Sequence, residues 1–208
     1  MADEQSIPDS PAAEPTRKRP KPGERRIQIL QALAAMLEQP GAERVTTAAL
    51  AARLQVSEAA LYRHFASKAQ MFEGLIDFIE SSLFGLLNQI AEGPHAQMDK
   101  ARRMITVLLQ FAERNPGMAR VMVGDALVFE NERLHQRMNL FFDKVEASLR
   151  QVLRDAAQAN ASSTPTVDAQ VQASVWVSFV VGRLQRFARS GYKRSPLEHM
   201  DASLALLT

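Results

Sequence analysis

The chain has 208 residues, of which 46% are hydrophobic, with 25 basic and 23 acidic side chains and no cysteine. That length suits one domain, or a small domain attached to a larger one, and the hydrophobic content excludes a wholly disordered chain. Without cysteine there are no disulfides, thiolate metal sites or cysteine nucleophiles.

The charges are unevenly placed along the chain. Residues 1–16 have a net charge of −4, whereas residues 17–68 carry ten bases against four acids, a net charge of +6. A basic N-terminal third favours a polyanion site at that end, although a solvated basic face would give the same count. The longest run without a charged residue, 169–182, has 14 residues and is too short to span a bilayer. No secretory signal is visible, so we expect a cytoplasmic protein without a membrane partner.

The predicted elements begin after a proline-rich start. Half of the ten prolines fall in the first 22 residues, so residues 1–23 are predicted to be a disordered basic arm. Apolar residues then recur every three or four positions, at Ile27, Leu30, Leu33 (or Ala34) and Leu37, which predicts a helix that ends at Gln39-Pro40-Gly41. Further N-caps are predicted at Thr46 or Thr47, at Ser57 and at Ser67.

The helix that begins at Ser67 is followed by more helices, over about 97–114, 117–131, 133–156 and 167–190. The breaks between them are Gly93-Pro94, Asn115-Pro116-Gly117 and the Ser/Thr/Pro stretch over 159–166. No alternating strand pattern, hairpin or repeat is visible. The predicted fold class is all-α, with a helix-turn-helix domain over 24–68 and a helical domain over 69–208.

The segment VTTAALAARLQVSEAALYRHFASK, residues 45–68, contains two short helices joined by the turn Gln55-Val56-Ser57. This is the arrangement of a helix-turn-helix, although an ordinary helical hairpin has the same pattern. Short side chains let the second helix enter a major groove, and cationic or polar ones reach phosphates. The candidate DNA-binding residues are Arg25, Arg26, Thr46, Thr47, Ser57, Glu58, Ala59, Tyr62, Arg63, His64 and Lys68.

LYRHF followed by SK resembles the signature at the end of the DNA-binding domain in TetR-family regulators. The resemblance implies three N-terminal helices for DNA and a helical C-terminal domain for dimerisation. It also implies that Tyr62 contacts a phosphate, that Phe65 anchors the core, and that Lys68 contacts DNA at the start of the next helix. Gln55 stands where the family usually has glycine, and a left-handed Gln55 would cost about 1 kcal/mol.

Four longer stretches resemble the nucleoid occlusion factors within that family: TTAALAARLQVSEAALYRHFASKAQMF, LIDFIESSL, FAERNPGMARVMVGDALVFE and RLHQRMNLFFDKVEASLRQV. The resemblance implies a nucleoid-associated dimer, with one or more dimers per site, that binds pseudo-palindromic double-stranded DNA. It further implies binding to the division protein FtsZ and inhibition of its ring. The family's FtsZ contacts match Phe78, Arg114 and Asn115, whereas Leu86 and Gln110 stand where the family has arginine and glycine. The alternative is a ligand-responsive TetR-type repressor.

Two apolar helices in the C-terminal half predict a four-helix dimer interface. One has a stripe from Leu134 to Val152, and the other is apolar around much of its circumference with Ser174, Ser178 and Gly182 four positions apart. A core helix within a monomer would show a similar pattern. The candidate interface residues are Phe141, Val145, Leu149, Val175, Ser178, Phe179 and Gly182.

No catalytic, metal or cofactor site is predicted. The four histidines, His64, His95, His135 and His199, are widely separated and none lies at ligand spacing from carboxylates. There is no glycine-rich phosphate loop and no serine nucleophile elbow. Glu130 and Glu132 cannot share one helical face and are predicted to belong to a solvated turn. The sequence therefore favours a binding protein over an enzyme.

Overall fold

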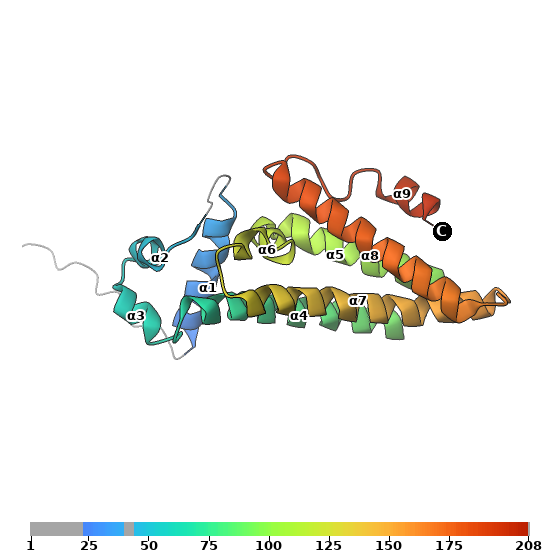
Figure 1. Cartoon of the computed structure of the whole chain (residues 1–208), viewed down its shortest axis with the longest axis horizontal. Coiled ribbons are helices and arrows are strands. Elements are labelled where there is room, and N and C mark those ends of the chain that lie inside the picture. The colour runs from blue at the N-terminus through green and yellow to red at the C-terminus, as the bar shows by residue number, and fades with distance from the viewer. Residues whose placement is uncertain (1–22, 40–43, 208) are drawn as a thin grey trace, which may run out of the picture.

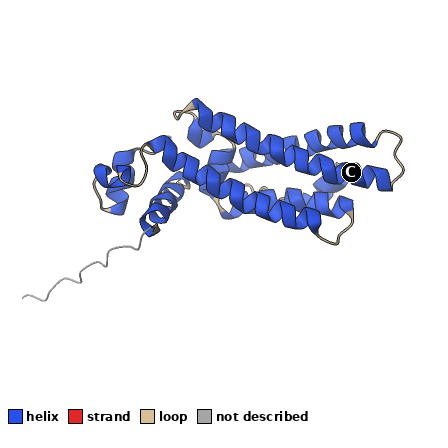
Figure 2. Cartoon of the chain, turned by 90° about the horizontal axis from the view of Figure 1, so that it is seen from below, coloured by secondary structure: helices blue, strands red, loops and turns tan. Residues whose placement is uncertain are grey.

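The structure, a computed structural model, describes residues 23–39 and 44–207, and every element within those ranges is helical (Figures 1 and 2). The helices are α1 (Glu24–Leu37), α2 (Thr47–Leu54), α3 (Glu58–Tyr62), α4 (Lys68–Glu92), α5 (Gln97–Arg114), α6 (Pro116–Met122), the 3-10 helix η1 (Asp125–Leu127), α7 (Glu132–Ala159), α8 (Pro165–Arg189) and α9 (Met200–Leu206). The predicted all-α class is confirmed. The predicted arm lies outside the described residues except for Gly23.

Most predicted helices have the expected limits, and three features differ from the prediction. The helix predicted over 117–131 is wrong: α6 ends at Met122, because Gly124 adopts φ 79° and turns the chain into η1. In α1 the side chain of Ile27 is 57% exposed, and Ile29 is buried in its place. The short α9 was not predicted.

The first three helices form a head at one end of the molecule, and α4 leads from it into a body of long helices (Figure 1). In the body α7 packs most extensively on α8 and also contacts α4 and α5. We call α1–α3 the head and α4–α8 the body. No helix within the described ranges is long and apolar enough to cross a membrane.

A continuous hydrophobic core joins the head to the body. Phe65 at the end of the head is 1% exposed and belongs to the same cluster as Phe72 of α4 and Trp176 of α8. The indole N–H of Trp176 donates a hydrogen bond to the backbone oxygen of Leu207 over 3.1 Å, so the segment around α9 closes the far side of this core. The head is therefore packed onto the body and is not a separate module on a linker.

Close backbone packing joins α1 of the head to α6 of the body. A Cβ added to Gly117 would lie 2.3 Å from the backbone oxygen of Ala34, so only glycine allows this approach. The carbonyl oxygen of Leu37, at the end of α1, accepts hydrogen bonds from the Arg120 guanidinium (3.3 Å) and the Tyr192 hydroxyl (3.1 Å). These contacts fix the C-terminal end of α1 against the body.

Candidate nucleic-acid interface

Side-chain caps and one left-handed residue shape the turn between α2 and α3. The Thr46 hydroxyl accepts a hydrogen bond from the Ala49 N–H (3.1 Å), and the Ser57 hydroxyl accepts one from the Ala60 N–H (3.2 Å). Gln55 adopts φ 54° and ψ 47°, the left-handed conformation, at a cost of about 1 kcal/mol for a residue other than glycine. The two caps therefore fix the residues at which α2 and α3 begin.

The small core under this turn sets the face that α3 presents. Leu61 of α3 and Phe65 are buried against Leu50 and Ala51 of α2, all at 4% exposure or less. Phe65 is thus a core residue, as the resemblance implied. The opposite face of the segment is open, and its exposed residues are Glu58, Ala59, Tyr62, Arg63 and His64.

The N-terminal ends of α2 and α3 are tied to each other. The Thr47 hydroxyl donates a hydrogen bond to a carboxylate oxygen of Glu58 over 2.5 Å. This bond brings four candidate residues, Thr46, Thr47, Ser57 and Glu58, to one edge of the head. Backbone N–H groups and the positive dipole end of α3 lie at the same edge, where anions bind favourably.

The two arginines of α1 differ in their surroundings. The Arg26 guanidinium donates a hydrogen bond to the backbone oxygen of His64 and lies 4.0 Å from the centroid of the Phe65 ring. Arg25 is half-buried, while Arg26 stays exposed. Arg26 therefore already has a structural contact that holds α1 on the end of α3.

Lys68, expected to contact DNA, pairs with an acidic residue of the body. Its ammonium forms an ion pair with Glu130, in the loop before α7, and lies 5.6 Å from the centroid of the Phe72 ring. The side chains of Lys68 and Glu130 are only 19% and 10% exposed. The prediction that Glu130 belongs to a solvated turn is therefore wrong, because the loop folds back onto the start of α4.

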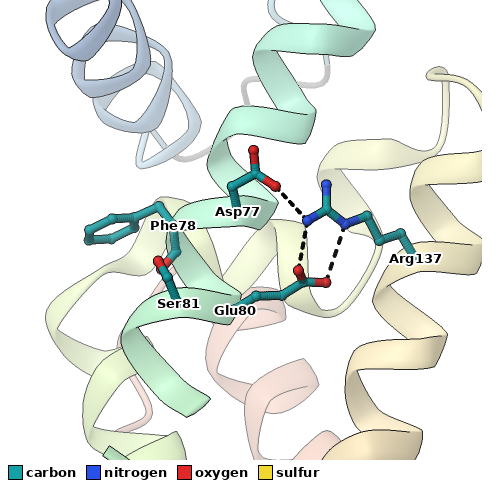
Figure 3. Close-up of polar contacts among 5 residues, drawn as sticks. All are labelled: Asp77, Phe78, Glu80, Ser81 and Arg137. Atoms are coloured by element: carbon teal, nitrogen blue, oxygen red, sulfur yellow. Dashed lines mark hydrogen bonds and ion pairs between the residues drawn. The ribbon is translucent and has the colours of Figure 1, made fainter. Parts of the chain in front are cut away.

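Further ion pairs continue from Lys68 along α4 and α7. Glu73 pairs with Arg133 (2.6 Å), and the Arg137 guanidinium bridges Asp77 (2.5 Å) and Glu80 (2.6 Å), as Figure 3 shows. The hydrogen bond to Glu80 is the largest cause that raises the pKa of Arg137 above its ordinary value. We call this series, with Lys68–Glu130, the α4–α7 seam.

The predicted partner residues lie together on the outer face of α4 and α5. Phe78 is 48% exposed and its ring points away from the ion pairs of Asp77 and Glu80 (Figure 3). Its ring centroid is 6.1 Å from that of Phe111. Arg114 is exposed one turn beyond Phe111, and the Asn115 amide donates a hydrogen bond to the Phe111 backbone oxygen over 2.7 Å. We call Phe78, Phe111, Arg114 and Asn115 the aromatic patch.

The two departures from the family pattern differ in exposure. Leu86 is 43% exposed, farther along α4 than Phe78, whereas Gln110 of α5 is half-buried. Leu86 therefore adds exposed apolar area to α4 at a position where the resemblance implied an arginine.

The prediction that residues of α7 form the dimer interface is corrected by the structure. Phe141, Val145 and Leu149 are at most 1% exposed, because their stripe faces the core of the same chain. The ring of Phe141 lies 5.4 Å from that of Phe84, in α4. On α8, by contrast, Val175 and Ser178 are exposed, and Phe179 and Gly182 are half-buried.

Two open cavities lie between the region of η1 and the helices α7 and α8. Their volumes are about 370 and 360 Å³, and their linings share Val123, Gly124, His135 and Gln185. The described part of the chain contains no group of three His, Asp or Glu side chains that could hold a metal ion.

Two family models match the sequence. One, described as a tetracyclin repressor-like, SlmA-like C-terminal domain, matches residues 95–208, and the model of bacterial regulatory proteins of the tetR family matches residues 29–75. The nucleoid occlusion factor SlmA of Vibrio vulnificus strain YJ016 is 49% identical over 189 residues, 90% of this chain and 96% of that protein. The chain belongs to the SlmA family. SlmA of Vibrio cholerae serotype O1 is 50% identical over 185 residues, covering 88% and 94% of the two chains.

The resemblance of the sequence to TetR regulators and to nucleoid occlusion factors is therefore confirmed. Among solved structures, the regulator FadR from Bacillus halodurans has a TM-score of 0.71 at 14% identity and covers 90% of this chain and 96% of that one. AibR, in complex with isovaleryl coenzyme A and operator DNA, has a TM-score of 0.68 at 17% identity, with 88% and 97% covered. At these identities the similarity shows that this chain shares the fold of those regulators.

Proposed function

We propose that this SlmA-family protein is a dimeric, DNA-bound inhibitor of cell division. In this proposal it binds pseudo-palindromic chromosomal sites in the cytoplasm and antagonises FtsZ ring assembly over the nucleoid. The observation that carries the proposal is the open face of α3 on a capped helix-turn-helix, in a chain that is similar to SlmA over 90% of its length. No catalytic role is proposed.

The DNA-binding step uses the exposed side of the head. Ala59 has a short side chain at the start of α3, which allows the helix to enter a major groove. Tyr62 and Arg63 extend from the next turn and are the proposed phosphate contacts. Thr46, Thr47 and Ser57 lie at the N-terminal ends of α2 and α3, where the helix dipoles favour an anion.

The dimer is proposed to form through the outer face of α8. Val167, Val171 and Val175 are 61%, 59% and 45% exposed and recur every fourth residue along one face. Gly182 continues that face, and a Cβ added to it meets nothing within 4 Å. An exposed stripe of β-branched residues beside small ones suits close packing against the same helix of a second copy.

The aromatic patch is the proposed FtsZ-binding surface. Phe78 presents an exposed ring, Phe111 supports it, and the exposed Arg114 adds a positive charge at the rim. A buried aromatic anchor with an arginine beside it is the composition that dominates binding energy at protein interfaces. The patch lies on the body, so DNA and FtsZ can be held at once.

Binding of purified protein to FtsZ, measured with and without DNA duplex, tests this function. We expect the protein to bind FtsZ and to reduce FtsZ polymerisation, measured by light scattering, when DNA is present. Absence of FtsZ binding in the presence of DNA would contradict the proposed function.

The second candidate is a ligand-responsive repressor, which the cavities beside η1 favour. Their lining combines His135, Gln185 and Arg189 with apolar residues, a mixture that suits a small amphipathic ligand. This candidate predicts release from DNA on ligand binding and no interaction with FtsZ.

A further inference from the structure

We propose that Lys68 and Glu130 are a positioning pair that fixes the head on the body. Lys68 then contributes to DNA binding by holding the head at the correct spacing, and not by contacting a phosphate. This inference rests on the proposed DNA-binding function, and it reassigns a lysine that the family resemblance places on DNA.

The first observation is that the pair is largely enclosed. The two side chains are 19% and 10% exposed, and the Lys68 ammonium also lies 5.6 Å from the Phe72 ring centroid. The Glu130 N–H donates a hydrogen bond to the Leu127 backbone oxygen over 2.8 Å, which fixes the loop around the carboxylate. If Lys68 turned to a phosphate, it would leave a mostly buried carboxylate without its cation, which is unfavourable.

The second observation concerns the start of α4. Lys68 is the first residue of that helix, whose first turn contains no acidic side chain. A cation at this end is opposed by the helix dipole, and a carboxylate there is favoured. Glu130 supplies the missing negative charge from the body, so the pair stabilises the first turn of α4 as well as joining two elements.

The third observation is the order of charges along the α4–α7 seam. At Lys68–Glu130 the cation is on α4, whereas in the other pairs α4 supplies the acids and α7 the arginines, Arg133 and Arg137. Sliding α7 by one turn would bring Arg133 toward Lys68, so like charges would meet. This order of charges favours the observed alignment of α7 along α4 and disfavours alignments shifted by one helical turn.

The register matters because α4 begins directly after the head. Lys68 lies six positions after the end of α3 at Tyr62, so any rotation of α4 against α7 moves α3. Two heads of a dimer must reach half-sites about 34 Å apart on the same duplex face. A fixed α4–α7 register therefore sets the spacing of the two recognition helices.

The experiment compares Glu130→Gln, Lys68→Gln and the exchanged pair Lys68→Glu/Glu130→Lys. The matched control is Arg63→Gln, which changes an exposed cation directly after α3. The probe is a duplex selected from a random-sequence pool by the wild-type protein, with derivatives that have one base pair added or removed between the half-sites. Affinity is measured over a salt series, and circular dichroism and sedimentation check fold and assembly.

We expect both single variants of the pair to weaken binding to the selected duplex by a similar factor, within about tenfold. They should keep the wild-type salt slope and tolerate altered spacing better than the wild type. The exchanged pair should restore affinity because it remakes the ion pair. Its spacing preference should stay relaxed, because α4 would then supply only acids to the seam and a shift of α7 would no longer bring like charges together. Arg63→Gln should instead lower the salt slope by about one phosphate contact.

A phosphate contact by Lys68 predicts the opposite pattern, and this would overturn the inference. Glu130→Gln would then bind as well as the wild type or more tightly, and Lys68→Gln would lower the salt slope. Failure of the exchanged pair to restore binding would also overturn it. If the wild type selects no sequence, the proposed function fails, but salt slopes on a random duplex still distinguish the two roles of Lys68.

Discussion

The Tyr192 hydroxyl donates a hydrogen bond to the backbone oxygen of Leu37 over 3.1 Å, and so joins the turn after α8 to the last residue of α1. Residues 155 positions apart thereby connect the body to the head. Only the neutral hydroxyl can make this bond, because a phenolate has no proton to donate.

Burial is the main cause that raises the pKa of Tyr192 above the ordinary tyrosine value of about 10. The pKa of Tyr192 is higher in the folded state than in the unfolded state. The stability that the neutral Tyr192 hydroxyl contributes is therefore present below about pH 10 and is lost as the pH rises through the folded-state pKa. We expect Tyr192→Phe to lower the free energy of unfolding by about 1 kcal/mol at neutral pH. Urea denaturation at pH 7 and above pH 10 checks this, and a variant that loses stability at high pH as steeply as the wild type would contradict it.

Gly117→Ala should loosen the contact between head and body. The added methyl group would lie 2.3 Å from the Ala34 backbone oxygen, so α6 must move away from α1. We expect a loss of about 1–3 kcal/mol in the free energy of unfolding, and weaker DNA binding through a displaced head. The control is Gly85→Ala, since a Cβ there meets nothing within 4 Å; it should keep or raise stability. Equal stability of both variants would show that the close approach is not maintained.

Gly182→Glu should separate the proposed dimer. A carboxylate enclosed at a helix contact costs several kcal/mol unless it is paired, which would raise the dimer Kd at least about a hundredfold. Gly85→Glu introduces the same charge on α4, away from the proposed interface, and should leave assembly unchanged. Sedimentation at micromolar concentration measures both. Wild-type protein that sediments as a monomer would refute the dimer directly.

Arg114→Asp should weaken FtsZ binding while fold, dimerisation and DNA affinity stay unchanged. The side chain is exposed at the end of α5, and reversing a rim charge mainly slows association with an acidic surface. We expect a loss of about tenfold in affinity. Arg103→Asp, an exposed position on the same helix, is the control. If Arg114→Asp and Phe78→Ala both bind FtsZ like the wild type, the aromatic patch is not the binding surface.

Local features of this fold could be read from the sequence because their signals lie within a few residues. The caps at Ser57 and Ser67 depend on adjacent side chains and backbone, and the structure has both. The limits of α5 were predicted from the breaks before Gln97 and after Arg114. In each case the conformation is decided within one short segment, without contacts from distant parts of the chain.

Features that depend on distant segments were not predictable in this way. The Lys68–Glu130 pair joins positions 62 residues apart, and nothing local marks Glu130 as a partner. The stripe through Phe141 and Val145 shows that one face of α7 is buried, but periodicity does not tell whether the same chain or a second copy covers it. For Phe141 the covering residues belong to its own chain, including Phe84. For Phe78 the sequence allowed either a core position on α4 or an exposed one, and the residue is 48% exposed.

The shared core has a consequence for engineering. A cut between residues 68 and 69, the boundary predicted from the sequence, would pass through the first turn of α4 and separate Phe65 from Phe72, which belong to one hydrophobic cluster. A helix-turn-helix transplanted from another regulator would therefore arrive without its packing partners. A functional chimera with new DNA specificity should keep this chain's Ala34, Phe65 and Lys68, and replace only the outward side chains of α2 and α3. DNA specificity in this fold can thus be changed by replacing surface side chains, but not by exchanging the whole helix-turn-helix domain.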